Sequence, residues 1–434
     1  MNANPTELTK SYSDVQCQLL FDMFNAAVSS ALPAKCIPPN LPARPKGRTV
    51  VIGAGKAAAS MSRAVEDNWD GPLKGVVVTR YGHAVACRRI NVLEAAHPIP
   101  DEAGVDAASA VLRAVSDLTR DDLVLCLLSG GGSALLPALP PGVSLADEQD
   151  LTRRLLRSGA SIGEINCVRS QVSRIRGGRL AAAAYPAKVV SLIISDVPGD
   201  IPSLIASGPT TPSISTSREA MAILERYNLD VPDAIQTWLQ SEESLPPAAG
   251  ELAHASHVII ASAKTALETA SHVAQEAGYR CVILGDAIEG EARNVGRDQA
   301  RIAYDVLSGN QPVEPPCILL SGGETSVTVR TEGPGGRNAE FLLGFMAGSE
   351  PRSEIYALAA DTDGIDGTEE NAGVIMDPSS WSRAAEQHLD PMQYLDQNNA
   401  YSFFKALGDL VVTGPTRTNV NDFRAILIDP STPS

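Results

Sequence analysis

Short runs of apolar residues recur along the chain, and segments with helical spacing lie between most of them. The runs are apolar over their whole length instead of alternating with polar residues, which is typical of strands buried on both faces of a parallel sheet. Strands that alternate with helices form α/β folds with right-handed crossovers. We therefore predict two Rossmann-like α/β/α lobes with mostly parallel sheets and a cleft between them. The expected strands are 49–52, 76–78, 90–94, 123–129, 189–195, 258–262, 280–284, 318–321, 356–360 and 424–428.

The expected helices occupy the segments between these strands. Apolar residues recur every three or four positions from Val15 to Val28, which predicts a first helix of about four turns. The segment 326–330 follows the strand at 318–321 closely, so we expect these two to form a hairpin at a sheet edge. Further helices are expected at 104–118, 147–158, 218–227, 265–277 and 291–307.

The length of 434 residues is enough for two or three domains, each with its own core. A composition shift at 241–257 is polar and contains a Pro pair and a Gly between two strand–helix series. Such segments are typical of domain boundaries. We therefore predict an N-terminal α/β domain of residues 1–245 and a C-terminal α/β domain of residues 246–434.

The net charge limits which partners the protein can bind, and the cysteines indicate the compartment in which it works. The chain has 35 Lys and Arg against 51 Asp and Glu, and this net charge of −16 argues against binding the phosphate backbone of a nucleic acid. No apolar run approaches the ~18 residues of a membrane span, and the N-terminus lacks an apolar signal core. Seven widely spaced cysteines favour a reducing compartment. We expect a soluble, cytoplasmic protein with a small-molecule substrate, and the sequence leaves open whether it forms a homodimer.

Gly53, Gly55 and Lys56 follow the first expected strand. In doubly wound sheets, ligands bind beyond the carboxyl ends of the strands, so these residues are candidates for a site. Glycines let the backbone approach a ligand, and a helix N-terminus and an ammonium both favour an anion. The alternative is a tight turn with a solvated Lys. His97 follows another strand and either lines the predicted cleft or is a buried, hydrogen-bonded histidine.

A second glycine-rich segment consists of Ser129, Gly130, Gly131, Gly132 and Ser133, after the strand at 123–129. Consecutive glycines raise the entropic cost of folding, and a loop that only connects two elements would not require them. Their presence therefore favours an anion-binding loop. The segment lacks the last Gly of the G-x-S-x-G nucleophile motif, and the chain contains no P-loop motif. The same strand-to-glycine turn recurs in the second half at Gly322, Gly323 and Glu324.

Charged side chains follow three other strands. Asp196 comes after the run at 189–195, where a carboxylate can hold Mg²⁺ or accept a proton; an Asx-turn or a helix cap is the alternative. Arg337 opens an expected helix and can bind phosphate or carboxylate through two N–H groups. Acids crowd behind the run at 356–360 and repel one another unless a cation or donors relieve them, which favours metal-assisted or base-assisted chemistry. These acids are Asp361, Asp363, Asp366, Glu369 and Glu370, and their spacing does not fit an EF-hand.

Ten motifs, in order along the chain, closely resemble those of the glycerate 2-kinase family whose C-terminal part is called the MOFRL domain. They are VVIGAGKAA, EAAHPIPDEAG, LLSGGGSALL, INCVRSQVS, IRGGRLA, SLIISDVPGD, IASGPT, LSGGETSVTV, GGRNAEF and ADTDGIDGT. Many members carry an older name, hydroxypyruvate reductase of tartrate-utilisation gene clusters. The resemblance covers nearly the whole chain. It implies a two-domain α/β kinase that phosphorylates the 2-hydroxyl of D-glycerate from ATP with Mg²⁺.

The resemblance also implies roles for single residues. Lys56 and Arg337 resemble the cationic groups for carboxylate and phosphates, and Asp363 resembles the group that orients or deprotonates the attacking hydroxyl. Asp196 is our own candidate for a Mg²⁺ ligand. The expected substrate- or nucleotide-binding residues are Gly53, Gly55, Ser129, Gly130, Gly131, Gly132, Ser133, Gly322, Gly323, Glu324, Asn338 and Asp366.

The chain departs from the family pattern at one motif. The family usually has VRKHLS and then IKGG where this chain has VRSQVS and IRGG, so Ser170 and Gln171 replace a cation and a histidine, while Arg176 keeps its charge. An anion contact from position 170 or 171 is therefore in doubt, and the substrate preference can differ.

Two other functions remain open. Gly53-x-Gly55-x-x-Ala58 is close to a dinucleotide fingerprint, and Arg80, at the end of the next strand, could accommodate the 2′-phosphate of NADP in a hydroxypyruvate reductase. That function leaves the acidic segment and the three-glycine loop unexplained. A non-catalytic sensor of a small anion is the third alternative, and the carboxylates argue against it because acids hinder anion binding.

Overall fold

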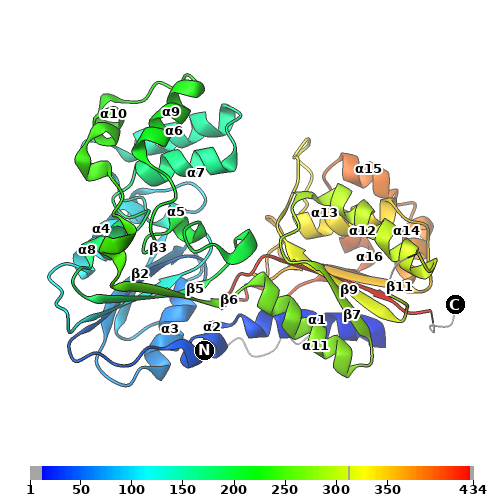
Figure 1. Ribbon diagram of the computed structural model, residues 1–434. Coiled ribbons are helices and arrows are strands. Elements are labelled where there is room, and N and C mark those ends of the chain that lie inside the picture. Colours follow the sequence, from blue (N-terminus) through cyan, green and yellow to red (C-terminus); the bar gives the residue numbers. More distant parts are fainter. Residues whose placement is uncertain (1–11, 311–312, 431–434) are drawn as a thin grey trace. The chain divides into compact units, whose positions relative to one another are not determined.

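The computed structural model describes residues 12–310 and 313–430, which divide into two compact units. We call residues 33–260 the middle unit, and residues 1–32 together with 261–434 the terminal unit. Each unit contains one six-stranded sheet covered by helices (Figure 1). The mixed α/β class expected from the sequence is confirmed.

The middle unit is built on a parallel sheet with the strand order β3-β2-β1-β4-β5-β6. The order reverses between β1 and β4, which is the switch point beside which open α/β sheets bind ligands. The strands are β1 (Thr49–Ala54), β2 (Lys74–Arg80), β3 (Ile90–Ala95), β4 (Leu123–Leu128), β5 (Lys188–Ile194) and β6 (Ala255–Ala261). The six sequence-predicted strands of this half are therefore confirmed.

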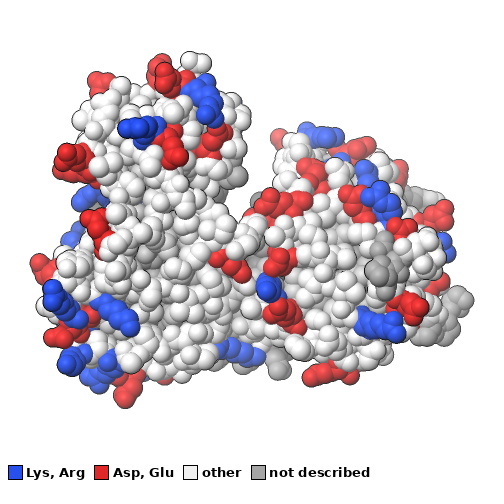
Figure 2. Space-filling view, in the orientation of Figure 1, with Lys and Arg blue, Asp and Glu red and all other residues white. Residues whose placement is uncertain are grey.

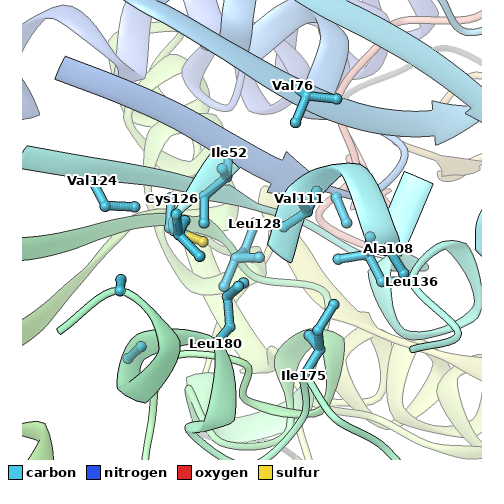
Figure 3. Packing of buried hydrophobic residues seen from close by; sticks show 14 of the residues in the cluster. Ile52, Val76, Ala108, Val111, Val124, Cys126, Leu128, Leu136, Ile175 and Leu180 are labelled. Carbon is cyan, nitrogen blue, oxygen red and sulfur yellow. The ribbon is translucent and has the colours of Figure 1, made fainter. Parts of the chain in front are cut away.

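Helices cover this sheet because its strands are apolar on both faces. Ile52, Cys126 and Leu128 of the central strands pack against Val111 of α4 and Leu180 of α8 (Figure 3). The helices near the sheet are α2 (Pro33–Cys36), α3 (Ala58–Asn68), α4 (Glu102–Ala114), α5 (Gly132–Leu135) and α8 (Arg179–Ala183). The unit also has single turns of 3₁₀ helix at Pro38–Asn40, Pro198–Asp200, Ile205–Ser207, Glu242–Ser244 and Ala249–Leu252.

Four further helices form a second layer of the middle unit, beyond the end of the sheet (Figure 1). They have an apolar core of their own, which includes Leu151, Val168, Ile223 and Trp238. These helices are α6 (Leu145–Arg157), α7 (Ile162–Gln171), α9 (Ser217–Arg226) and α10 (Asp233–Gln240).

The sheet of the terminal unit has the order β13-β12-β11-β14-β9-β7 and is mostly antiparallel, so the prediction of a second mostly parallel sheet was wrong. Among its described pairs, β7 and β9 alone run parallel. An all-apolar run reports burial on both faces of a strand and carries no signal for strand direction. The strands are β7 (Arg280–Gly285), β9 (Cys317–Gly323), β11 (Ile355–Asp361), β12 (Gly373–Met376), β13 (Leu410–Val411) and β14 (Asp422–Ile428).

The first helix, α1 (Val15–Ser30), belongs to the terminal unit, whereas the expected boundary after residue 245 grouped it with the N-terminal half. It packs on α11 and β11, and the Phe24 ring lies 5.7 Å from that of Phe423. The spacing of apolar residues identifies a helix and its buried face, but not the sheet that this face covers. The other helices of the unit are α11 (Ala263–Glu276), α12 (Ala292–Leu307), α13 (Arg337–Ala347), α14 (Ser379–Glu386), α15 (Pro391–Asp396) and α16 (Ala400–Leu407).

The expected hairpin at 326–330 is wrong. The short strand β10 (Thr325–Ser326) pairs in parallel with β8 (Gly290–Glu291), not with the strand before it. The backbone N–H of Thr328 then donates to the side chain of Glu291 at 3.0 Å, so a side chain takes the bond that a hairpin partner would provide.

The surface carries both signs of charge. In the face drawn in Figure 2, Lys and Arg lie singly or in small groups among Asp and Glu. None of the helices in the described residues is both long enough and apolar enough to span a membrane.

Candidate active site

The turn after β1 lies against the loop after β4, at the switch point of the middle sheet. A Cβ atom on Gly55 would lie 2.2 Å from the Ser129 Oγ, and φ of Gly55 is +136°. A Cβ on Gly53 would lie 2.2 Å from the Leu127 carbonyl oxygen. Both glycines are therefore needed for the close approach of two protein segments, which gives them a packing role.

The first N–H groups of α3 are already used within the protein. The Lys56 N–H donates to the Gly130 carbonyl at 2.9 Å, and the Ala57 N–H donates to the Ser129 Oγ at 3.0 Å. The Ala58 N–H donates to the Gly55 carbonyl at 3.1 Å. An anion at this turn would therefore meet the Lys56 side chain, and not a set of open backbone donors.

Residues 129–133, which we call the glycine loop, have open donors instead. In the part of the chain that the structure describes, the N–H groups of Gly130 and Gly131 donate to no acceptor. Gly131 has φ of +80°, and a Cβ on it would lie 2.9 Å from the His97 Nε2, so the imidazole lies directly against the loop. Open N–H groups in a turn of this kind can bind an anion.

Cations surround His97. Burial makes the largest contribution to lowering the pKa of His97, and the charges of Lys56, Arg80 and Arg169 add to it. Together they bring this pKa to about 4. The imidazole is therefore neutral near pH 7. The sequence left open whether His97 is a site residue, and its contact with the glycine loop places it at the candidate site.

Arg176 is hydrogen-bonded to the last residue of the glycine loop, Ser133. Its Nη2 donates to the Ser133 carbonyl at 2.9 Å and its Nη1 donates to the Arg169 carbonyl at 2.7 Å. Burial lowers the pKa of Arg176 to about 10, with a further contribution from Arg169. The Glu148 carboxylate lies 3.7 Å from Arg169 and 3.9 Å from Arg176, so it only partly offsets two guanidinium charges.

Gln171, where the family usually has histidine, has a structural role in this chain. Its Nε2 donates to the Ser215 carbonyl at 2.9 Å, and its Oε1 accepts from the Arg179 Nη2 at 3.1 Å. Ser170, at the neighbouring departure from the family pattern, is 9% exposed. Neither side chain carries a positive charge for an anion, and the Gln171 amide is already hydrogen-bonded to protein atoms.

Asp196 follows β5, the strand next to β4, and is partly buried. Among the residues that the structure describes, no group of three or more His, Cys, Asp or Glu side chains is arranged to hold a metal. Mg²⁺ is usually held by one or two carboxylates together with waters and substrate phosphates. A single carboxylate here fits a Mg²⁺ ion that arrives with phosphates, and does not fit a metal centre built by the protein alone.

Arg337 is the first residue of α13 in the terminal unit, and three carboxylates hold it. Its Nη2 lies 2.7 Å from Asp361 and 3.3 Å from Asp422, and its Nη1 pairs with Glu324. Burial lowers the pKa of Arg337, but these carboxylates raise it by more, so the pKa lies above its usual value. We call these four residues, with Arg424, the Arg337 cluster.

Arg424 pairs with one of these three acids, Asp422. It is completely buried, its Nη2 lies 2.5 Å from the Asp422 carboxylate, and its guanidinium lies over the ring of Phe341. Of the five acids predicted to crowd here, Asp361 pairs with Arg337, whereas Arg424 pairs with Asp422, which lies outside that segment. Asp422 and Arg424 were not among the site residues predicted from the sequence. The only sign of them in the sequence is that two charged residues stand at the start of an apolar run. Because β14 is antiparallel to β9 and β11, its start lies beside the carboxyl ends of those two strands.

Asp366 and Asn338, expected to bind substrate or nucleotide, have protein partners. Asp366 caps α13 by accepting the N–H groups of Asn338 at 3.0 Å and Ala339 at 2.8 Å. Burial raises the pKa of Asp366 to about 6, although these two hydrogen bonds lower it. The Asn338 Nδ2 donates to Asp422 at 2.9 Å. Both residues therefore position the start of the helix that carries Arg337.

Asp363 lies in the turn after β11 and is 5% exposed. Its backbone N–H donates to the Asp361 Oδ1 at 3.0 Å, and its Oδ1 accepts the Ile365 N–H at 2.9 Å. The carboxylate is therefore held in a fixed orientation beside a member of the Arg337 cluster.

Gly322 and Gly323 do not form a second glycine loop. Both lie inside β9, where Gly323 pairs with Asp422 and Gly322 pairs with Phe423. A Cβ on Gly323 would lie 2.2 Å from the Ile288 N, so this glycine is required by close packing. The expectation of matching loops in the two halves was wrong, because antiparallel pairing extends β9 through the glycines. Glu324, next in the chain, does reach Arg337.

Comparisons with known proteins agree over nearly the whole chain. Residues 19–240 match the family described as Domain of unknown function (DUF4147), and residues 317–422 match the MOFRL family. A protein of Agrobacterium vitis that carries a provisional name, hydroxypyruvate reductase, is 50% identical over 96% of this chain and 96% of its own length. The D-glycerate 2-kinase of Thermotoga maritima is 38% identical over 93% of this chain and 96% of its own length.

A solved structure agrees as well. The crystal structure of a glycerate kinase from Thermotoga maritima matches with a TM-score of 0.89 and 38% identity, and the match covers 95% of this chain and 99% of that one. Identity above 30% over almost the full length of both chains leaves no large segment unaccounted for. The chain therefore belongs to the MOFRL-type glycerate 2-kinase family.

Proposed function

We propose that the chain transfers the γ-phosphoryl group of ATP to the 2-hydroxyl of D-glycerate, with Mg²⁺, and so forms 2-phosphoglycerate. The observation that carries the proposal is the full-length similarity to a D-glycerate 2-kinase, in a chain whose sheet edges carry cations and open N–H donors. Phosphoryl transfer needs positioning and charge neutralisation more than a covalent nucleophile. The two units each supply groups of this kind.

Lys56 and the glycine loop are the proposed anion-binding groups of the middle unit. The N–H groups of Gly130 and Gly131 can donate to phosphate oxygens, and Lys56 adds a full positive charge. Asp196 would hold Mg²⁺ together with phosphate oxygens. Mg²⁺, when bound, neutralises charge on the transferred group.

Arg337 and Asp363 are the proposed reacting-centre groups of the terminal unit. Arg337 is held before substrate arrives, so it can stabilise the charge of the transferring phosphoryl group without reorganising. Asp363 would orient the 2-hydroxyl and accept its proton, because its carboxylate is nearly buried and its orientation is fixed by hydrogen bonds.

The NADP-dependent hydroxypyruvate reductase remains the second candidate because the Agrobacterium relative carries that name. A dinucleotide pyrophosphate binds to the N–H groups of the turn after β1 and the following helix. Here those of Lys56, Ala57 and Ala58 donate to protein atoms. This use of the donors disfavours the reductase.

Two assays separate the candidates. Purified protein with ATP, Mg²⁺ and D-glycerate should release ADP at a rate that depends on glycerate, measured by a coupled assay. Absence of turnover with every three- or four-carbon hydroxy acid would rule the kinase out. The second assay mixes the protein with NADPH and hydroxypyruvate, and steady oxidation of NADPH there would favour the reductase instead.

A cytoplasmic location is also part of the proposal. All seven cysteines are free thiols in the structure, as expected for a reducing compartment. Whether the chain forms a homodimer can be measured by light scattering on the purified protein.

A further inference from the structure

A pocket of about 520 Å³ lies in the middle unit between α7, α9 and the segment 203–215. Its volume falls within the range of about 300–1,000 Å³ that is usual for pockets holding drug-sized ligands. A three-carbon hydroxy acid would fill only a small part of it. None of the sequence-predicted site residues lines this pocket.

The lining combines hydroxyl groups with apolar side chains. Five serines contribute hydroxyls, namely Ser170, Ser203, Ser207, Ser213 and Ser215. The apolar surface comes from Leu204, Ile214, Ala222 and Ile223. This mixture suits a ligand with a flat apolar part and several hydroxyls of its own.

The charged residues of the lining leave no cation for an anionic ligand. Arg226 is the one Lys or Arg among the lining residues, and its Nη1 lies 2.6 Å from the Glu164 carboxylate. Glu219 accepts the N–H of Thr216 at 2.7 Å and so caps α9. A carboxylate or phosphate group would therefore find no electrostatic partner in this pocket.

Ser207 connects the pocket to the glycine loop. Its Oγ lies 3.0 Å from the Oγ of Ser133, the last residue of that loop. Ala206 and Ser207 have positive φ values of 51° and 59°, a strained backbone for non-glycine residues that recurs at ligand sites. The Gly177 N–H holds the strained turn by donating to the Ser207 carbonyl at 3.1 Å. The pocket, whose one arginine is paired with Glu164, is thus adjacent to the loop proposed to bind anions.

We propose that this pocket binds the nucleoside part of the phosphoryl donor, with the phosphates extending toward the glycine loop. The assignment rests on the proposed kinase function. A ribose offers hydroxyls to the serines, and a base offers an apolar face to Leu204 and Ile223. A nucleotide is neutral at its nucleoside end and anionic at its phosphate end. The pocket would hold the neutral end, and the neighbouring glycine loop would hold the anionic end.

The test is a substitution that places a large side chain in the pocket. Ala222 is exposed on α9, so the A222W variant adds bulk inside the pocket without touching the glycine loop. We expect ADP binding, measured by calorimetry, to weaken at least tenfold. Inorganic triphosphate, which has phosphates and no nucleoside, should bind A222W as it binds the wild type. The matched control is A146W, an exposed alanine on α6 outside the lining, and it should bind ADP like the wild type.

The remaining outcomes overturn the assignment. Unchanged ADP binding by a folded A222W protein would do so, and so would an equal loss of triphosphate binding. A raised KM for glycerate with unchanged ADP binding would give the pocket to the acceptor. If A222W does not fold, as judged by its melting curve, A222L decides the same comparison with a smaller expected loss. ADP binding is measured without turnover, so a failure of the kinase proposal is recognised separately, by wild-type protein that binds ADP and transfers nothing.

Discussion

The glycine loop of the middle unit and the Arg337 cluster of the terminal unit use positive charge in different ways. Lys56, Arg80 and Arg169 act together on His97, and Glu148 offsets only part of the nearby charge. Arg337, by contrast, is in contact with three carboxylates. Several cations close together attract an incoming anion, whereas a cation held by carboxylates has its position fixed in advance. This difference is the basis for the binding role that we propose for the first site and the transfer role that we propose for the second.

The two sheets show the same contrast at the level of the backbone. The sequence LLSGG occurs twice, at 127–131 in the last residues of β4 and the loop after it, and at 319–323 within β9. In the parallel sheet the glycines leave the strand and form a loop with open N–H groups, whereas in the antiparallel sheet Gly322 and Gly323 pair with β14. A glycine pair at a strand end therefore becomes a binding loop only where no neighbouring strand uses its hydrogen bonds.

The strongest test of the transfer role is Asp363→Asn. If the carboxylate accepts the proton of the 2-hydroxyl, kcat should fall by about 10²–10⁴-fold, while ADP binding stays within about twofold. Steady-state kinetics and calorimetry measure the two quantities. Asp305→Asn, on α12 and away from the cluster, is the matched control. A wild-type rate for Asp363→Asn would make Asp363 a structural residue of the turn after β11.

Arg337→Gln should have the next largest effect. Loss of a fixed cation from the reacting centre is expected to lower kcat by about 10²–10³-fold. The same change leaves Glu324 and Asp361 without their arginine, whereas Asp422 keeps Arg424, so the melting temperature should fall as well. Arg337→Lys keeps the charge and loses the two-pronged geometry, and it should show an intermediate kcat. Equal rates for the Gln and Lys variants would contradict an electrostatic role.

Lys56→Met tests the binding role of the middle unit. Removing one of several cations should raise the KM for an anionic substrate by about 10-fold or more, and should weaken the dependence of that KM on salt. Lys264→Met, an exposed lysine on α11, serves as the control and should behave like the wild type. An unchanged KM for both substrates would remove Lys56 from the anion site.

His97→Gln should give the smallest effect, on the pH dependence of stability. The folded-state pKa of His97 is about 4, below the usual value of 6.5, so the unfolded state binds the proton more tightly. The stabilising contribution is complete above pH 6.5 and is lost as the pH falls toward 4, by about 1–3 kcal/mol. Urea unfolding from pH 4 to pH 7.5 measures it. His97→Gln should flatten this part of the profile, and an unchanged profile would mean that burial and the nearby cations do not lower the pKa of His97.

Helices and strands were predicted from the sequence more reliably than which elements pack or pair with one another. All ten apolar runs predicted as strands are strands in the structure, because an all-apolar run has few alternatives to a buried strand. The direction of β14 was not predictable, since burial on both faces looks the same in parallel and antiparallel sheets. For the same reason α1 was recognised as a helix but grouped with the wrong half. These failures concern long-range pairing, which local spacing does not encode.

The positions of Lys56, Arg337 and Asp363 near the ends of strands agree with the expectation from the sequence, and their roles stay predictions. Asp422 and Arg424 were missed because their place depends on the antiparallel strand. Asp366 was assigned to binding because an acid that caps a distant helix has the same local sequence as an acid that faces a substrate.

The most direct test of the central claim is transfer of label from [γ-³²P]ATP to D-glycerate, with the product position determined by chromatography against 2- and 3-phosphoglycerate. The account predicts labelled 2-phosphoglycerate with the wild type and transfer at least about 100-fold slower with Arg337→Gln. No label in glycerate with the wild type, or undiminished transfer with Arg337→Gln, would contradict it.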